Sequence, residues 1–234
     1  MTNTMPPISI ILPVLNEAAG LAEALKALAP LRKNGVEIIV VDGGSSDRSA
    51  EMAMAHADRV INAPRGRASQ MNAGAAAAQG RVLLFLHADT RLPEVADRLI
   101  MQAIASGHRW GHFNARIEGN SAWLPVVAKL MNWRSRRTGI ATGDQAIFVS
   151  AVAFHAAGGF PDIPLMEDIA LSRRLLNICR PACLAAEVAT SGRRWETHGV
   201  LRTIMLMWWL RLRYFLGADP HQLATEYGYV SRRP

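Results

Sequence analysis

The sequence predicts an α/β protein with a Rossmann-like, doubly wound and mostly parallel sheet. Short apolar runs such as Ile8–Leu12 and Val36–Val41 lack the polar–apolar alternation of a half-exposed strand. Segments with helical spacing of apolar residues separate these runs, and the connections between them are short. Strands that alternate with helices in this way form parallel sheets covered by helices on both faces.

The first strand and helix are indicated by prolines and by apolar spacing. Ile8–Leu12 is apolar and lies between a proline pair and Pro13, which predicts a buried strand. Glu17–Ala29 carries leucines on one helical stripe, and we expect this helix to end before Pro30. Polar residues therefore come shortly after the first strand.

The next strands and helices follow the same pattern. Val36–Val41 predicts a second buried strand, and Asp47 can cap a helix that continues to about Ala55. Arg59–Asn62 predicts a short third strand, and Arg67–Ala78 predicts the helix after it.

A fourth strand is expected over Arg81–Leu86, ending at His87-Ala88-Asp89. Pro93 is expected to open the next helix, because proline is well tolerated in a first helical turn. The alternation of strand and helix thus extends to about residue 107.

Beyond residue 108 the rhythm changes. We expect strands over Trp110–Glu118, Gly143–Val149 and Ala182–Val188, helices over Ser121–Arg137 and Glu167–Asn177, and a polar loop over Ser191–Trp195. No repeat or long linker divides the chain, so its 234 residues predict one domain. Within that domain we assign about 1–107 to a first half, about 108–196 to a second half, and 197–234 to a tail of amphipathic helices.

The chain is basic, with a formal net charge of +7 at pH 7. Such a balance suits nucleic acid, an anionic membrane surface or a phosphorylated small molecule. The arginines are scattered, and no nucleic-acid-binding motif accompanies them. We therefore expect no nucleic-acid partner and retain the other two classes.

The tail segment Val200–Leu216 is apolar and aromatic, but arginines interrupt it. Its longest uncharged stretch, Thr203–Leu210, is far shorter than the ~20 residues that a spanning helix requires. The segment could lie at a membrane interface or pack on the domain or a partner chain, and the sequence favours neither. Cys179 and Cys183 offer no metal set or disulfide framework, and Met1–Pro7 lacks a signal-peptide pattern. We expect a cytoplasmic protein, with peripheral association at the inner face of the membrane as an alternative.

Polar and acidic residues follow three expected strands: Asn16-Glu17, Asp42 and Asp89. Ligands of doubly wound sheets bind beyond the carboxyl ends of the strands, so we expect these residues to converge on one crevice. A carboxylate there can hold Mg²⁺ or Mn²⁺, which prefer oxygen ligands and bridge to substrate phosphates. Asp89 is the predicted metal ligand, with His87 as a second ligand or a phosphate donor. Alternatively, His87 is an ordinary strand-end histidine and Asp89 caps a helix.

Three further segments have both a functional and a simpler interpretation. Arg65 and Arg67 flank a glycine at a helix start, which favours phosphate, although a solvated loop would look the same. Glu167-Asp168 opens a helix, where the helix dipole stabilises acids. Arg193-Arg194-Trp195 on its own is typical of a surface loop.

Taken together and in order, the segments SIILPVLNE, EIIVVDGGSSD, FLHADT, GDQAIFV, GGFPDIPLMEDIALSRRL and SGRRWE resemble the family-2 inverting glycosyltransferases of the GT-A fold. The resemblance covers essentially the whole chain. RGRASQMNAG, FLHADT and PLMEDIALSRRL also resemble a small bacterial subgroup described as arsenosugar-biosynthesis-type glycosyltransferases. The family resemblance implies a GT-A fold and metal-dependent transfer of a sugar from a nucleotide-diphosphate sugar to an acceptor hydroxyl. It also implies a divalent metal, Mg²⁺ or Mn²⁺, as cofactor.

The resemblance also implies roles for residues that match the family's motifs. Asp89 matches the last aspartate of the Asp-x-Asp metal motif, and Asp168 matches the catalytic base of a Glu-Asp pair that begins with Glu167. Nucleotide-sugar contacts are implied for Pro13, Leu15, Asn16, Glu17, Asp42, Arg65, Arg67, His87 and Ala88. Contacts to the acceptor or its phosphate are implied for Asp144, Gln145, Arg193, Arg194 and Trp195.

Two positions depart from the family pattern. His87 replaces the first aspartate of the metal motif, which puts its ribose contact and metal strength in question. Ser191 stands where the last motif has glutamine, so we do not expect a processive polymer synthase. The alternatives are a sugar-phosphate nucleotidyltransferase, which would need a glycine-rich, lysine-containing loop near the first strand, and a catalytically silent, membrane-docked module that binds nucleotide-sugars. The acceptor stays open between a lipid phosphate and a small molecule.

Overall fold

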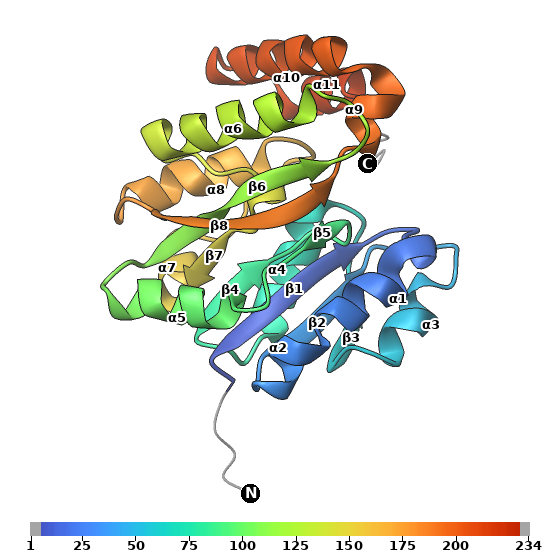
Figure 1. Ribbon diagram of the computed structural model, residues 1–234, viewed down its shortest axis with the longest axis vertical. Helices are drawn as coiled ribbons and strands as arrows, with labels where there is room; N and C mark the ends of the chain where they lie inside the picture. Colours follow the sequence, from blue (N-terminus) through green and yellow to red (C-terminus); the bar gives the residue numbers. More distant parts are fainter. Residues whose placement is uncertain (1–5, 230–234) are drawn as a thin grey trace, which may run out of the picture.

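The computed structural model describes residues 6–229, which form a mixed α/β molecule around one eight-stranded sheet of order β3-β2-β1-β4-β7-β6-β8-β5 (Figure 1). Its strands are β1 (Ile8–Val14), β2 (Glu37–Asp42), β3 (Arg59–Asn62), β4 (Val82–Phe85), β5 (Thr90–Arg91), β6 (Trp110–Glu118), β7 (Phe148–Ser150) and β8 (Ala182–Ser191). Its α-helices are α1 (Ala18–Ala27), α2 (Ala29–Lys33), α3 (Ser49–Met54), α4 (Arg67–Ala77), α5 (Ala96–Ala105), α6 (Leu124–Thr138), α7 (Ala151–Ala156), α8 (Glu167–Leu176), α9 (Arg193–His198), α10 (Val200–Phe215) and α11 (Pro220–Glu226). Most of the segment Met1–Pro7 and the last residues of the tail, 230–234, lie outside the described residues.

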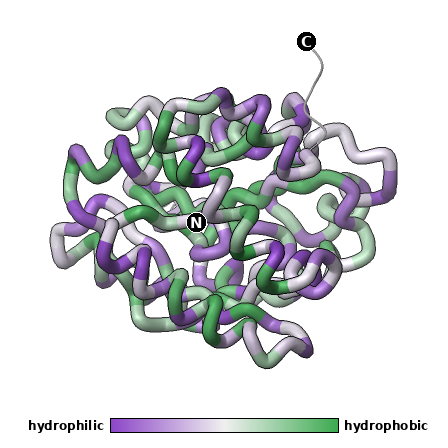
Figure 2. The backbone as a smooth tube through the Cα atoms, turned by 90° about the horizontal axis from the view of Figure 1, so that it is seen from above, coloured by the Kyte–Doolittle hydropathy of each residue, from purple (hydrophilic) through white to green (hydrophobic). Residues whose placement is uncertain are grey.

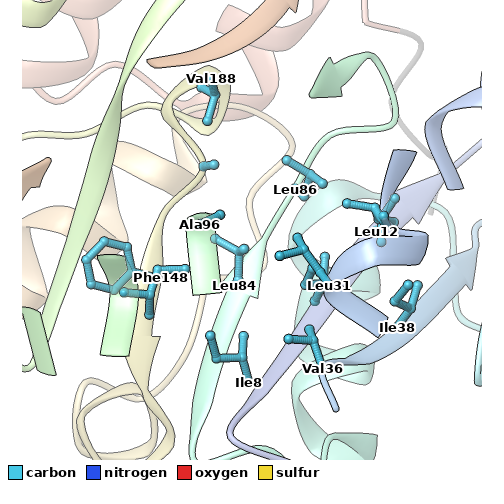
Figure 3. Packing of buried hydrophobic residues seen from close by; sticks show 14 of the residues in the cluster. Ile8, Leu12, Leu31, Val36, Ile38, Leu84, Leu86, Ala96, Phe148 and Val188 are labelled. Carbon is cyan, nitrogen blue, oxygen red and sulfur yellow. The ribbon is translucent and has the colours of Figure 1, made fainter. Parts of the chain in front are cut away.

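The amino-terminal half is a parallel sheet whose side chains alternate between two helical layers. β1 pairs in parallel with β2 and β4, and β2 pairs in parallel with β3. Ile10 and Leu12 belong to the buried cluster under α1 and α2, whereas Ile11 belongs to the cluster under α4 on the opposite face. Figure 3 shows the first cluster, to which Leu12 of β1 and Leu31 of α2 both belong. The predicted doubly wound, mainly parallel sheet is confirmed.

Helix α4 packs very closely on this sheet. A Cβ atom on Gly74 would lie 2.4 Å from Cγ2 of Ile11, so only glycine permits this approach without displacement. One turn earlier, Nε2 of Gln70 donates hydrogen bonds to the carbonyl oxygens of Val14 at 2.9 Å and Val41 at 2.8 Å. These contacts fix the start of α4 beside the carboxyl ends of β1 and β2.

The second half extends the same sheet with mixed strand directions. β6 pairs antiparallel with β7 and parallel with β8, and β5 pairs antiparallel with β8. A register shift between Phe113 and Asn114 interrupts the β6–β8 ladder. Leu124 and Val127 of α6 pack on this part of the sheet near Ile117. In Figure 1, α6, α8 and the tail helices lie at the end of the molecule opposite α1–α3.

Two predicted helix boundaries are wrong, and both involve proline. The first helix ends at Ala27, and Pro30 lies in the first turn of the separate short helix α2, where its missing N–H costs nothing. The fifth helix does not begin at Pro93. The Pro93 carbonyl instead accepts a turn hydrogen bond from the Ala96 amide at 3.0 Å, and α5 begins there.

Two predicted segments in the second half also differ. Gly143–Val149 is not one strand, because Thr142 and Gln145 form a capping box that closes a 3₁₀ turn over Gly143–Gln145. Strand β7 starts only at Phe148. Ser191–Trp195 is not a loop, because β8 continues to Ser191 and α9 begins at Arg193, with only Gly192 between them.

The helical tail packs through one face and exposes the other. Leu210 of α10, Leu223 of α11 and Met166 belong to one buried cluster. Trp208 and Trp209 project into solvent from the opposite side, at 67% and 55% exposure. Across residues 6–229, no helix combines the length and the apolar character needed to cross a bilayer.

Hydrophobic and hydrophilic residues alternate along the outer coils of the backbone (Figure 2).

Candidate active site

Two adjoining hollows lie beyond the carboxyl ends of the parallel strands. The first encloses about 330 Å³ between the end of β1, the first turn of α4 and the turn after β4. Its lining comprises Pro13, Val14, Leu15, Glu17, Arg65, Gly66, Arg67, Gln70, His87, Ala88, Asp89, Arg194, Gly228 and Tyr229. This is the crevice position that a doubly wound sheet predicts.

The second hollow encloses about 160 Å³ and contains the acidic start of α8. Its walls include Asp144, Glu167, Asp168, Trp195 and Arg211. Arg67, His87, Asp89 and Arg194 line both hollows, so the two spaces meet at these four side chains. Asp89, the expected metal ligand, and Asp168, the expected base, both line the second hollow.

The turn after β4 places His87 against Asp144. Nδ1 of His87 lies 3.5 Å from Oδ1 of Asp144. A Cβ on Gly143 would lie 2.4 Å from Cε1 of His87, so this glycine makes room for the imidazole ring. Burial opposes ionisation of Asp144, but the hydrogen bond from His87 and the nearby guanidinium of Arg67 lower the pKa of that carboxyl below its ordinary value. Asp144 is thus held as an anion in the second hollow, beside His87.

Asp168 is held rigidly at the first turn of α8. Its Oδ2 accepts a hydrogen bond from the amide of Gly143 at 2.8 Å, and its Oδ1 accepts one from the amide of Ile169 at 2.7 Å. The preceding Met166 has a left-handed backbone, with φ of 69°, which turns the chain sharply into the helix. These two amides therefore hold the Asp168 side chain at the second hollow.

Glu167, the other member of the acidic pair, has a different environment. Its side chain is buried at 5% exposure and lines the second hollow. Burial, followed by the neighbouring charge of Asp168, raises the pKa of Glu167 to about 7. The pair thus combines a firmly hydrogen-bonded aspartate with a glutamic acid that holds its proton to near neutral pH.

The carboxyl-terminal residues form one wall of the first hollow. The guanidinium of Arg194 lies 3.6 Å from the centre of the Tyr227 ring and donates a hydrogen bond to the Tyr227 carbonyl at 2.8 Å. Tyr227 stacks on Tyr229, whose ring faces the guanidinium of Arg67 at 5.7 Å. Sequence reasoning missed both tyrosines, because no local pattern marks a segment that reaches the site from the end of the fold.

Four expected site residues do not line either hollow. Asn16 turns its side chain to accept a hydrogen bond from the Ser46 amide at 2.8 Å. Asp42 is buried, and its Oδ2 accepts hydrogen bonds from the amides of Gly44 and Ser45, both at 3.0 Å. These contacts order the loop after β2 and draw both side chains away from the first hollow.

Gln145 and Arg193 are the other two. Gln145 is fully buried, and its Nε2 donates to the hydroxyl of Ser135 at 2.9 Å, so it supports α6 from inside. Arg193 begins α9 and is not part of either lining, whereas the next two residues, Arg194 and Trp195, both line the second hollow. The remaining expected residues lie at one hollow or at both.

The residues at the junction fit a metal ion that a substrate shares. Within residues 6–229, no three histidine, cysteine, aspartate or glutamate side chains are grouped to hold a metal on their own. Apart from a long contact with the Thr90 hydroxyl at 3.4 Å, no described hydrogen bond occupies the Asp89 carboxylate, and His87 also lines this junction. Mg²⁺ and related ions commonly take one or two carboxylates and complete their shell with phosphate oxygens and water. Asp89 suits that arrangement and not a complete protein cage.

The fold and the site define a class of protein. A Rossmann-like parallel half, a second mixed half that continues the sheet, and two hollows that meet at a strand-end acid are the features of the GT-A glycosyltransferase fold. A profile of "Glycosyl transferase family 2" matches residues 9–150. This match covers more than half of the chain, so the chain belongs to glycosyl transferase family 2, as predicted.

Curated relatives agree with this assignment. The chain is 32% identical over 157 residues to the undecaprenyl-phosphate 4-deoxy-4-formamido-L-arabinose transferase of Pseudomonas aeruginosa, covering 62% of this chain and 46% of the relative. It is 24% identical over 200 residues to the probable glycosyltransferase YdaM of Bacillus subtilis, covering 74% and 47%. The chain therefore spans less than half the length of these relatives.

Solved structures share the fold at low sequence identity. TarS of S. aureus in complex with UDP-GlcNAc has a TM-score of 0.64 at 17% identity, with coverage of 79% of this chain and 58% of that one. The mannosyltransferase PcManGT of Pyrobaculum calidifontis, in complex with GDP-Man and Mn²⁺, has a TM-score of 0.61 at 17% identity, with coverage of 80% and 57%. The predicted GT-A-type fold is confirmed.

Proposed function

We propose that this protein is an inverting glycosyltransferase that moves a sugar from a nucleotide-diphosphate sugar to an acceptor hydroxyl, with a divalent metal as cofactor. The observation that carries the proposal is the meeting of the two hollows at Arg67, His87, Asp89 and Arg194. In this arrangement the first hollow takes the nucleotide and the second takes the acceptor. The sugar and its diphosphate lie at the junction, between two guanidiniums and a carboxylate.

On the donor side, Arg67 and Arg194 bind the diphosphate, since guanidinium forks match phosphate oxygens. A divalent ion held by Asp89, with His87 nearby, would neutralise charge on the departing nucleoside diphosphate. Mg²⁺ or Mn²⁺ suits this role, and PcManGT was solved with Mn²⁺. Glu17, which also lines the first hollow, contacts the nucleoside.

On the acceptor side, Asp168 acts as the general base. The acceptor oxygen forms a bond to the anomeric carbon while the bond from that carbon to the diphosphate oxygen breaks. The acceptor proton passes to Asp168, and the nucleoside diphosphate leaves. A single in-line displacement of this kind inverts the anomeric configuration. The amides of Gly143 and Ile169 hold the base in one orientation, which supports attack from one side only.

The acceptor is either a lipid phosphate or a small soluble molecule. A relative named for undecaprenyl-phosphate supports the first choice. The exposed Trp208, Trp209 and Phe215 of α10, with Arg202 and Arg213 on the same helix, support peripheral docking of a cytoplasmic protein at the inner face of a membrane. Membership of the arsenosugar-biosynthesis-type subgroup stays a prediction.

The substitution Asp168→Asn tests this proposal. A positioned base typically contributes ~10²–10⁴-fold in rate, so release of nucleoside diphosphate from a panel of nucleotide-sugars with Mn²⁺ should fall by that order. Binding of the same nucleotide-sugar, measured by thermal shift, should persist. The exposed Asp162→Asn serves as the matched control and should leave both measurements unchanged.

Other outcomes would contradict the proposal. Equal loss of binding and turnover in Asp168→Asn would make this residue structural. Release of pyrophosphate from a nucleoside triphosphate would identify a nucleotidyltransferase. Nucleotide-sugar binding with no slow hydrolysis or transfer, under any metal condition, would identify a silent binding module.

A further inference from the structure

Two arginines on different helices lie close together at the second hollow, and three of their nitrogens find no hydrogen-bond acceptor among residues 6–229. Arg134 is on α6 and Arg211 is on α10. Nε and one terminal nitrogen of Arg134, and Nε of Arg211, are shielded from solvent, and no residue among 6–229 accepts a hydrogen bond from them. Buried charged donors without acceptors are costly, and native folds rarely keep them without a function.

Burial disfavours the charged form of both arginines. Burial, followed by the like charge of Arg211, lowers the pKa of Arg134 to about 10. Burial likewise lowers the pKa of Arg211. The carboxylates of Asp144 and Asp168 act in the opposite direction on both arginines, yet neither arginine forms an ion pair with a described residue within 4.0 Å. The charge of Arg211 thus disfavours the charge of Arg134, and neither guanidinium is paired directly with a carboxylate of residues 6–229.

We propose that Arg134 and Arg211 form a subsite that binds a phosphate group of the acceptor. Arg211 lines the second hollow and no part of the first, which separates this subsite from the place of the donor diphosphate. The subsite rests on the proposed function only in that the second hollow is the acceptor side.

A phosphate monoester fits the arrangement better than a carboxylate does. It carries a charge of about −1.5 to −2 at neutral pH and three acceptor oxygens. Two guanidinium charges match the charge of a phosphate monoester, and Arg211 reaches the second hollow where such a group would enter, with Arg134 beside it. Asp168 lies near both arginines, so a phosphate bound there would anchor the acceptor beside the base.

The exposed surfaces of α6 and α10 help to decide whether the phosphate belongs to a lipid or to a soluble molecule. Trp133 of α6, Trp123 just before that helix and Trp208 of α10 are exposed. The helices that hold the subsite therefore also present aromatic side chains to solvent. A lipid phosphate could therefore place its head group at the arginines while the protein rests on the bilayer. A soluble phosphate monoester would use the same arginines without the aromatic surface.

The experiment measures binding of inorganic phosphate to the full chain by calorimetry. Wild type should bind, and Arg134→Gln and Arg211→Gln should each weaken binding by at least 10-fold. The exposed Arg137→Gln on α6 and Arg202→Gln on α10 are matched controls and should bind as wild type does. Because phosphate could also enter the donor side, Arg67→Gln is included and should retain most of the binding.

Two further arms identify the source and check the fold. Glycerol phosphate in solution and a polyprenyl phosphate in anionic vesicles are each tested as competitors of inorganic phosphate. The stronger competitor identifies the acceptor as a soluble phosphate monoester or a lipid phosphate. Nucleotide-sugar binding should survive in Arg211→Gln, which shows that the variant is folded. Equal phosphate affinity in wild type, Arg134→Gln and Arg211→Gln, or loss of binding only in Arg67→Gln, would overturn the subsite. Phosphate binding that depends on the subsite arginines without any nucleotide-sugar binding would retain the subsite and overturn the proposed function.

Discussion

Glu167 makes the stability of this protein depend on pH in a direction that can be worked out. Its pKa is raised from the ordinary 4.5 to about 7 in the folded protein, first by burial and then by Asp168. Between these two values the unfolded chain releases the proton while the folded chain keeps it, so stability falls as pH rises from about 4.5 to about 7. The gap between the values corresponds to roughly 3 kcal/mol.

The substitution Glu167→Gln removes this penalty, because glutamine occupies a similar volume and cannot ionise. At pH 5 the variant and wild type should unfold with similar free energies. At pH 8 the variant should be the more stable by up to roughly 3 kcal/mol, and each kcal/mol corresponds to about 2–4 °C in a chain of this size. Urea unfolding at both pH values, followed by circular dichroism, measures the difference. Parallel stability curves for the two proteins across this pH range would refute the argument.

Three other changes probe separate parts of the structure. Asp89→Ala should abolish metal-dependent nucleotide binding, and identical titrations with and without EDTA in wild type would exclude the metal role. Gly74→Ala should lower the free energy of unfolding by about 1–3 kcal/mol, since its Cβ would meet Ile11 at 2.4 Å, whereas Gly20→Ala in an open helical position should be neutral or slightly stabilising. Tyr227→Ala should weaken nucleotide binding about 10-fold, because the Tyr227 ring no longer holds the guanidinium of Arg194. Tyr227→Phe keeps the ring and should bind as wild type does. Unchanged binding in the alanine variant would show that this ring does not contribute to the nucleotide site.

The fold followed from the sequence where local pattern and tertiary environment agree. β3 and β6 have the predicted ends, although only β6 is mostly buried, because the run of strand-forming residues in each is bounded locally. Boundaries failed where a distant or competing contact decides them. Pro93 is compatible with a helix start, but its carbonyl closes a turn before α5, and the strand expected from Gly143 is broken by a capping box with Gln145.

The site could be predicted only in part, for a similar reason. Asp89 and Asp168 carry local signals, since each follows or begins an element at the edge of the sheet. Arg134 and Arg211 meet only because α6 and α10 pack behind the second hollow, and nothing near either residue marks it. Asp42 was expected to contact the nucleotide-sugar because it ends a strand. Instead, the amides of Gly44 and Ser45 in the following loop donate hydrogen bonds to its Oδ2.

The wall built by Gly228 and Tyr229 has a practical consequence for handling the protein. A purification tag or fluorescent reporter that replaced the chain directly after Tyr229 would begin against the first hollow and could displace the tyrosine from it. Strand β1 has seven residues and enters the sheet at Ile8, so its start lies roughly 20 Å from the hollow along the strand. Affinity handles and surface attachment therefore belong at the amino-terminal side, where they leave ligand access undisturbed.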